Sequence, residues 1–423
     1  MNTRPVSFFA PLPYFVAFVA APLAILAGRL SAKPGLGHSY GPGGMAPWVV
    51  LSAFAVLASL AGVGAARAQN NRRLWPVPVL TVMLAALAWV LVKTLALALA
   101  QAPDYAPLLD ELRLPALVGF AALWAWSFGP PQRESLARAG AGLGALVVLD
   151  FLLTAIMARG VVAGGGLLFG DAPGTTDALG FLLALALCAT LDDAPVPGVP
   201  RLARWLILAG LLASGSRAGL AAGALLCLLF ERGPVLRRAG MALACVLAIW
   251  VGLMLPLQRS GMAGDELGLE WYYAATVEAV SQQPEAIATG LPLDSPLALA
   301  MPEFQGMVWD ADNEGLPVSV FQIPASLLRL FAGWGAGGPL LVLGAGLICA
   351  LRGRRRFGYG LLTVLALCGC LAPVLHTPAT AAALALAFVS AARRAPATAV
   401  NAEQQPVAAP PEPENQETGP TPA

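Results

Sequence analysis

The sequence predicts an all-α integral membrane protein of about twelve transmembrane helices, with one large outer loop between the ninth and the tenth. Composition is the first observation behind this prediction, because 58% of the 423 residues are hydrophobic and only 12% are charged. Soluble domains carry about 25% charged residues. The second observation is a succession of apolar runs close to the ~20 residues that an α-helix needs to cross a bilayer.

The predicted spans follow one another along the chain and leave a single long gap before the tenth. In order, they lie near residues 12–29, 46–65, 75–99, 114–129, 137–158, 177–192, 202–214, 217–231, 239–256, 335–350, 358–374 and 376–392. The two short runs on either side of 214–217 also fit a close hairpin that enters from the outer surface. Because so many spans follow it, the first run is predicted to be an uncleaved helix rather than a signal peptide.

The distribution of positive charge predicts how these spans are oriented. If the N-terminus is cytoplasmic and the connections alternate, the inner connections hold 17 of the 25 basic residues and the outer ones hold 7, while Lys93 falls within a span. Cytoplasmic loops of membrane proteins carry such an excess of Arg and Lys. The distribution therefore predicts an even number of spans, with both termini cytoplasmic.

The gap between the ninth and tenth spans, residues 257–333, is predicted to be a functional loop with structure of its own. Within it, Glu270–Gln283 has the pattern of a short helix that Pro284 ends. Such a helix is suited to lying on the membrane surface, and a solvated spacer is the alternative. Its apolar residues are expected on or near one side: Trp271, Ala274, Ala275 and Val277.

The chain is divided into two parts on this basis. Residues 1–394 are predicted to form one transmembrane helical domain with the loop 257–333 inserted in it. Residues 395–423 are rich in Pro, Glu, Gln, Thr and Ala, a composition typical of disordered segments. They are predicted to form a disordered cytoplasmic tail.

Charge and cysteine content exclude several classes of function. The net charge of +1 gives no reason to expect a nucleic-acid partner. The six cysteines all lie in apolar runs, so no disulfide framework is expected. The two histidines, His38 and His376, form no metal-ligand pattern with cysteines, and we expect neither a metal nor another cofactor.

Arg217 is the most informative single residue, because it has no acidic neighbour within ten residues in either direction. It follows Ser214, Gly215 and Ser216, which permit a tight turn and the close approach of a ligand. A charge between two apolar runs is costly unless it lies at a membrane edge or in a wet cavity that faces a partner. Its planar guanidinium suits phosphate oxygens, although an arginine that ends a helix at the headgroup layer fits the pattern equally well.

Three stretches in the second half of the chain carry a resemblance to a known family. They are SGSRAGL at Ser214–Leu220, the Trp-led helix and Gly-containing turn LEWYYAATVEAVSQQPEAIATGLPLDSPL at Leu269–Leu297, and SLLRLFAGWGAGGPLLVL at Ser326–Leu343. In this order they resemble the O-antigen ligase and O-antigen polymerase superfamily of bacterial membrane glycosyltransferases. The likeness covers about residues 201–394, and the earlier half contributes only its number of spans.

The resemblance implies a multi-pass protein of the bacterial inner (cytoplasmic) membrane, with a periplasmic catalytic face and a periplasmic loop at 257–333. It implies a role in cell-surface polysaccharide biosynthesis, as in lipopolysaccharide or exopolysaccharide assembly. Polyprenyl-diphosphate-linked oligosaccharide units would be polymerised, or ligated to an acceptor. The implied partners are this lipid-linked glycan, an acceptor glycan or lipid, membrane lipids and polysaccharide export machinery.

The resemblance also assigns roles to residues, and the sequence departs from the family in two places. Arg217 matches the arginine motif that holds the diphosphate. The family's second arginine usually sits a few residues before the Trp of the helix, but 267–270 holds none, and Arg259 lies further back. The family's loop histidine maps to Pro324-Ala325, and the loop contains no histidine. These departures favour a polymerase-like or divergent relative over a ligase.

Glycan transfer needs cations that stabilise the leaving diphosphate and a base for the acceptor hydroxyl. We predict that the diphosphate is bound by Arg217, Arg259, Arg329 and Lys93, and that Arg217 and Glu270 are catalytic. For Lys93 the alternative is a side chain that extends to the headgroups without binding substrate. For Arg329 the alternative is a surface ion pair.

Two further titratable residues have simpler explanations beside a functional one. His376 begins the last span at the predicted outer edge, where a helix-end role is favoured over that of a base. Asp150 lies inside the fifth span, so it is a candidate functional residue whose expected partner is Arg159 or Lys93.

Two other classes of protein fit part of the pattern. A lipid-linked glycan flippase or another twelve-span transporter fits the number of spans, but the two halves show no repeat and there is a single large outer loop. A non-catalytic member of a polysaccharide export assembly fits the missing loop histidine.

Overall fold

The computed structural model of the chain describes residues 8–23, 42–60, 92, 106–157, 175–191, 201–254, 269–291, 296–297, 318–320, 323–353 and 355–392. The first helices are α1 (Leu12–Phe15), the π-helix η1 (Val16–Ala20), the 3-10 helix η3 (Pro42–Met45), α3 (Ala46–Leu60), α6 (Ala106–Phe128), α7 (Arg133–Met157) and α8 (Thr175–Thr190). They are followed by α9 (Arg201–Ser214), α10 (Arg217–Phe230), α11 (Val235–Met254), α12 (Leu269–Gln282), α13 (Ala286–Thr289), α15 (Ser326–Trp334), α16 (Gly337–Arg352), α17 (Arg355–Leu371) and α18 (Pro378–Ala391). The strands β1 (Pro296–Leu297) and β2 (Val318–Ser319) pair antiparallel, with Pro296 opposite Ser319.

Each predicted span that the structure describes contains a helix, although α6 begins at Ala106, well before the predicted start at 114. The third predicted span, 75–99, and the predicted tail, 395–423, lie outside the described residues except for position 92. By length and composition, one described helical segment, Arg133–Ile156, is able to cross a membrane, and seven others are apolar but only 10–17 residues long. The all-helical class is therefore confirmed, whereas twelve membrane crossings and the domain boundaries stay predictions.

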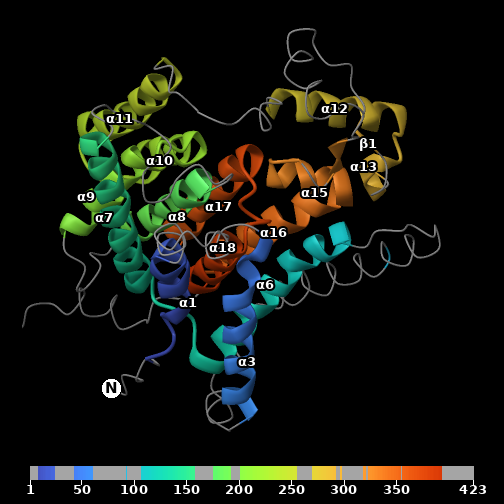
Figure 1. Cartoon of the computed structure of the whole chain (residues 1–423), viewed down its shortest axis with the longest axis horizontal. Coiled ribbons are helices and arrows are strands. Elements are labelled where there is room, and N and C mark those ends of the chain that lie inside the picture. The colour runs from blue at the N-terminus through green and yellow to red at the C-terminus, as the bar shows by residue number, and fades with distance from the viewer. Residues whose placement is uncertain are drawn as a thin grey trace, which may run out of the picture.

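The centre of the bundle is α8, which is apolar on every side and therefore buried on every side. Every residue from Ala178 to Ala189 is buried. The helix contacts α7, α9, α10, α17 and α18, and Figure 1 shows it between α10 and the last two helices. Elements from both halves of the chain thus pack around one helix.

Two glycines bring the backbones of α8 and α10 into contact. A Cβ built on Gly219 would lie 2.7 Å from the carbonyl carbon of Gly180, and a Cβ built on Gly180 would lie 2.3 Å from the Cβ of Ser216. No larger side chain fits between these helices unless one of them moves. The crossing therefore holds the start of α8 and the start of α10 in a fixed relation.

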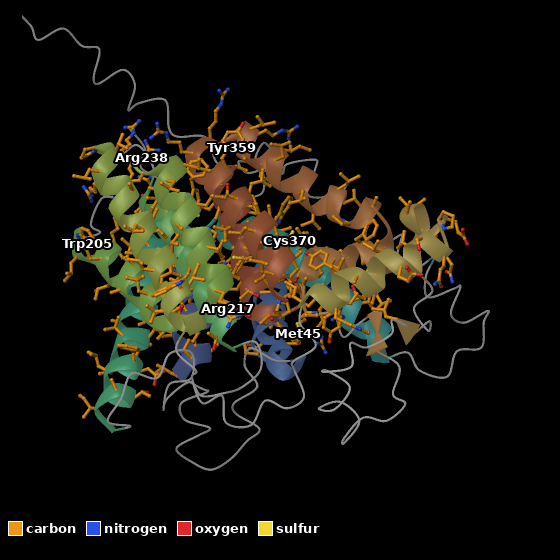
Figure 2. The ribbon with its side chains drawn as sticks, turned by 90° about the horizontal axis from the view of Figure 1, so that it is seen from above. Met45, Trp205, Arg217, Arg238, Tyr359 and Cys370 are labelled. Atoms are coloured by element: carbon orange, nitrogen blue, oxygen red, sulfur yellow. The ribbon has the colours of Figure 1, made fainter. Side chains whose placement is uncertain are left out.

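The bundle has two distinct ends. Figure 2 shows Arg217 and Met45 toward one end, and Arg238 and Tyr359 toward the other. We call them the Arg217 end and the Arg238 end. Arg204 of α9 pairs with Glu231, which follows α10 and is buried, so this ion pair lies at the Arg238 end.

Arginines are divided unequally between the two ends. Among the described residues, the Arg217 end holds Arg113, Arg217 and Arg329. The Arg238 end holds more of them, because α7, α9, α11 and α17 begin there and α16 ends there. Its arginines are Arg133, Arg138, Arg204, Arg232, Arg237, Arg238, Arg352, Arg355 and Arg356. The alternation of inner and outer connections stays a prediction.

Part of the predicted outer loop forms a small second core at the Arg217 end. Trp271 and Ala275 of α12 pack with apolar residues of α13, β1 and α15. The helical period places these two residues on one face, whereas Ala274 and Val277 are exposed. The predicted apolar side of this helix was therefore too broad, although α12 ends just before Pro284 as expected.

Candidate functional site

The turn between α9 and α10 presents Arg217. Gly215 has a φ of 66°, in the left-handed region that favours glycine, so the chain can reverse between Ser214 and Ser216. The hydroxyl of Ser216 then caps α10 by accepting the N–H of Gly219 at 3.1 Å. Arg217 is the first residue of α10, and it is exposed.

The structure adds a carboxylate to this turn. The hydroxyl of Ser216 donates to Oδ1 of Asp177 at 2.9 Å, across 39 residues of sequence. Asp177 belongs to the first turn of α8 and is half-buried. Thr175-Thr176-Asp177 before an apolar run marks the start of a helix, but sequence reasoning did not single out Asp177, because nothing in that pattern names its partner.

The last turn of α17 is the meeting point of the stretches that carry the family resemblance. From the first stretch, the carbonyl oxygen of Ala218 accepts from the thiol of Cys368 at 3.5 Å. From the second stretch, the hydroxyl of Tyr273 donates to the carbonyl oxygen of Cys370 at 2.8 Å. These contacts join residues 150 and 97 positions apart.

The third stretch reaches the same turn and also packs tightly against the second. The N–H of Ser326 donates to the carbonyl oxygen of Ala372 at 3.1 Å. At the end of α15, a Cβ on Gly335 would lie 2.6 Å from the carbonyl oxygen of Ala288, and a Cβ on Gly290 would lie 2.3 Å from a carbonyl oxygen of α15. Both glycines have a positive φ, 69° and 77°. Glycine is therefore required on both sides of this contact.

A buried polar cluster lies beside that turn and joins α6, α15 and the segment before α18. Nε of Arg329 donates to Oε1 of Glu111 at 2.6 Å. Nε2 of His376 lies 3.5 Å from Oε2 of Glu111, and its Nδ1 lies 3.4 Å from the hydroxyl of Ser326. The side chains of Glu111, Arg329 and His376 are 5%, 10% and 8% exposed.

The electrostatics of this cluster define the role of Glu111. Burial alone would raise the pKa of its carboxyl, but His376 and Arg329 together lower that pKa below its ordinary range. The carboxylate therefore stays charged and serves as a counter-ion. Arg329 is buried in this pair and not in a surface ion pair, and its binding to a diphosphate stays a prediction. His376 is held from two sides, which a plain helix-end residue would not require.

An apolar pocket begins next to this cluster and extends between α6, α16 and α18. Its walls include Leu114, Leu330 and Leu375, each within a few residues of a member of the polar cluster, and Phe388 further along α18. Such a lining suits a hydrocarbon chain. In the described ranges, no group of three or more His, Cys, Asp or Glu side chains is placed to hold a metal ion.

The remaining predicted site residues are only partly placed. Glu270 belongs to α12, but its side chain is outside the described part of the structure, as are Arg259 and Lys93. Their roles stay predictions. Asp150 is buried in α7, and its expected partners Arg159 and Lys93 both lie outside the described residues.

Comparison with known proteins does not name a family for this chain. No protein-family model matches the sequence, and no curated protein matches it either. The arrangement of the three stretches in space is therefore the main guide to function.

Proposed function

We propose that the protein is a membrane glycosyltransferase of cell-surface polysaccharide biosynthesis, which transfers the glycan of a polyprenyl-diphosphate donor to an acceptor hydroxyl. The observation that carries this proposal is the convergence of three separate stretches, 214–220, 269–297 and 326–343, on the last turn of α17. Their order along the chain does not require this convergence. Such convergence is what a shared catalytic site would require, because catalytic groups must be held in one place.

Exposed apolar side chains support the membrane location. Contiguous apolar patches larger than a few hundred Å² are uncommon on soluble monomers. Here large apolar side chains are exposed along α3, α7, α11 and α16: Val49, Val50, Leu57, Leu149, Leu152, Ile156, Leu243, Val246, Leu247, Trp250, Leu340, Leu347 and Leu351. We propose that lipid covers these surfaces in the bacterial inner membrane, and that the arginine-rich Arg238 end is cytoplasmic.

An amphiphilic donor needs a cation for its diphosphate and apolar contacts for its lipid. At the Arg217 end, the exposed guanidinium of Arg217 is suited to hold phosphate oxygens and to stabilise the charge that develops on the leaving diphosphate. The apolar pocket between α6, α16 and α18, which begins beside Arg329 and His376, is suited to supply the hydrocarbon contacts. Polymerisation is preferred over ligation because the loop histidine of the ligases is missing.

The test is glycan analysis in a host that lacks the protein and is complemented with variants of it. Arg217→Ala is expected to lower product formation about 10²- to 10³-fold at equal membrane abundance, because a donor to the developing charge is lost. Arg217→Lys is expected to restore only part, since an ammonium lacks the planar fork. Arg355→Ala is the matched control, an exposed arginine at the opposite end of the bundle.

Each result points to one class of function. Long polymer with the wild type and single repeat units with Arg217→Ala support a polymerase. Polymer that is made without the protein but is not attached to its acceptor indicates a ligase. Lipid-linked units that stay on the cytoplasmic face in the host that lacks the protein indicate a flippase. Full activity of Arg217→Ala would contradict the proposed role of the arginine.

A further inference from the structure

The inference concerns the base of the proposed transfer, for which the family resemblance leaves no histidine in the loop. Two of the described carboxylates, Glu111 and Asp150, are unsuited to serve as this base. Glu111 is 5% exposed and bonded to Arg329, and Asp150 is buried within α7. Asp177 differs from both, because it is half-exposed and lies at the start of its helix, at the Arg217 end.

The position of Asp177 relative to Arg217 is set by backbone packing. Its Oδ1 accepts the hydroxyl of Ser216, the residue directly before Arg217. Three residues further along each helix, Gly180 and Gly219 are in backbone contact. The start of α8, which carries Asp177, is thus held against the start of α10, which carries Arg217, and the two helices cannot shift without a clash. This is the rigid placement that proton transfer in a transition state demands.

We propose that Asp177 is the catalytic base that deprotonates the acceptor hydroxyl, an inference that rests on the proposed function. The acceptor oxygen attacks the anomeric carbon of the donor glycan, and a new C–O bond forms. The bond between that carbon and the phosphate oxygen breaks, and its electron pair leaves with the polyprenyl diphosphate, held by Arg217. The acceptor proton passes to Oδ2 of Asp177, which later releases it to water. Oδ1 stays bonded to Ser216 and keeps the carboxylate in position.

Asp177→Asn is the sharpest variant, because the amide oxygen still accepts the Ser216 hydroxyl while the base is lost. The purified full-length protein, in lipid nanodiscs, is assayed with lipid-linked oligosaccharide extracted from the host that lacks it. Turnover is expected to fall about 10²- to 10⁴-fold, with donor affinity within about twofold of wild type. Glu278→Gln is the matched control: this exposed acid on α12 contacts Gln282, and full turnover is expected.

A second variant separates catalysis from structure. Asp177→Ala is expected to regain part of its turnover when sodium formate is added, because formate can accept the proton in the vacated space. A merely structural aspartate gives no such rescue.

The outcomes separate the two proposals. If the wild type and Asp177→Asn are equally active, the role of Asp177 is overturned but the proposed function is not. The same holds if Asp177→Asn loses as much donor affinity as Arg217→Ala does. A wild type that binds the donor but transfers nothing to any acceptor overturns the proposed function, and the base falls with it.

Discussion

Glu111 lies between two basic side chains that come from other elements of the chain. Its carboxylate accepts from Arg329 of α15 and lies beside His376, which precedes α18. A buried charge is tolerated only when it is paired, and removing one partner leaves the other uncompensated. Two helices, α6 and α15, and the segment before α18 are therefore tied together by a single carboxylate.

Glu111→Gln is expected to lower the free energy of unfolding by about 3–5 kcal/mol, because Arg329 loses its counter-ion in a buried site. Unfolding of the protein by heat or denaturant in detergent micelles measures this change. Glu278→Gln removes an exposed carboxylate and should alter stability by less than about 0.5 kcal/mol. If Glu111→Gln and Glu278→Gln had the same free energy of unfolding, the pair of Glu111 with Arg329 would contribute nothing to stability.

The same carboxyl predicts a pH dependence. Glu111 precedes the span predicted at 114–129, and its folded pKa lies below the ordinary value of 4.5. A group with a lowered folded pKa stabilises the fold above its ordinary pKa, and this contribution is lost as the pH falls through the folded pKa. Because the folded pKa is about 2, the stability difference between wild type and Glu111→Gln should stay nearly constant from about pH 7 to 5 and shrink as the pH is lowered from about 4.5 toward 2. A difference that is constant with pH would contradict this explanation.

Charged residues were the hardest to interpret from sequence alone. Arg217 could be singled out because its isolation from acidic residues is visible along the chain. The contact of Asp177 with the residue before Arg217 depends on which helices pack together. The same is true of the pair between Arg329 and Glu111, which are 218 residues apart. No local pattern contains that information, so these partners could not be predicted.

At the scale of elements, the crossing of α8 and α10 determines the shape of the site. Gly219→Ala places a methyl group 2.7 Å from the Gly180 backbone, so the helices must separate. Overpacking of this kind costs about 1–3 kcal/mol, and thermal unfolding in micelles measures it. The control is Gly142→Ala on α7, where a Cβ meets nothing within 4 Å. Alanine there should be stabilising by roughly 0.5–1 kcal/mol, and equal effects at both positions would argue against the close crossing.

Helix positions were predictable from the long apolar runs, because a backbone that is removed from water must satisfy its hydrogen bonds internally, and a helix does so within one segment. The end of α12 before Pro284 was predictable for a similarly local reason, the missing N–H of proline. The apolar face of α12 was predicted too broadly, since only its packing against α13 and α15 selects Trp271 and Ala275 over Val277.

At the scale of the whole molecule, the proposed membrane orientation can be tested from the two ends of the bundle. Cys370 is the exposed one of the six cysteines, and it lies in the last turn of α17, at the opposite end of that helix from Tyr359. In sealed vesicles of known orientation, a membrane-impermeant maleimide is expected to label Cys370 from the periplasmic side. Arg238→Cys in a Cys370→Ser background should be labelled from the cytoplasmic side. The reverse pattern would contradict the proposed orientation.

The enclosure of α8 has a consequence for biosynthesis. Two of the helices that surround α8, α17 and α18, are made long after it. Until then one apolar flank of α8 lacks its native contacts and must be covered in another way. Ala372 and His376 follow α17 in the chain, so their contacts with Ser326 and Glu111 form only after α17 has been made.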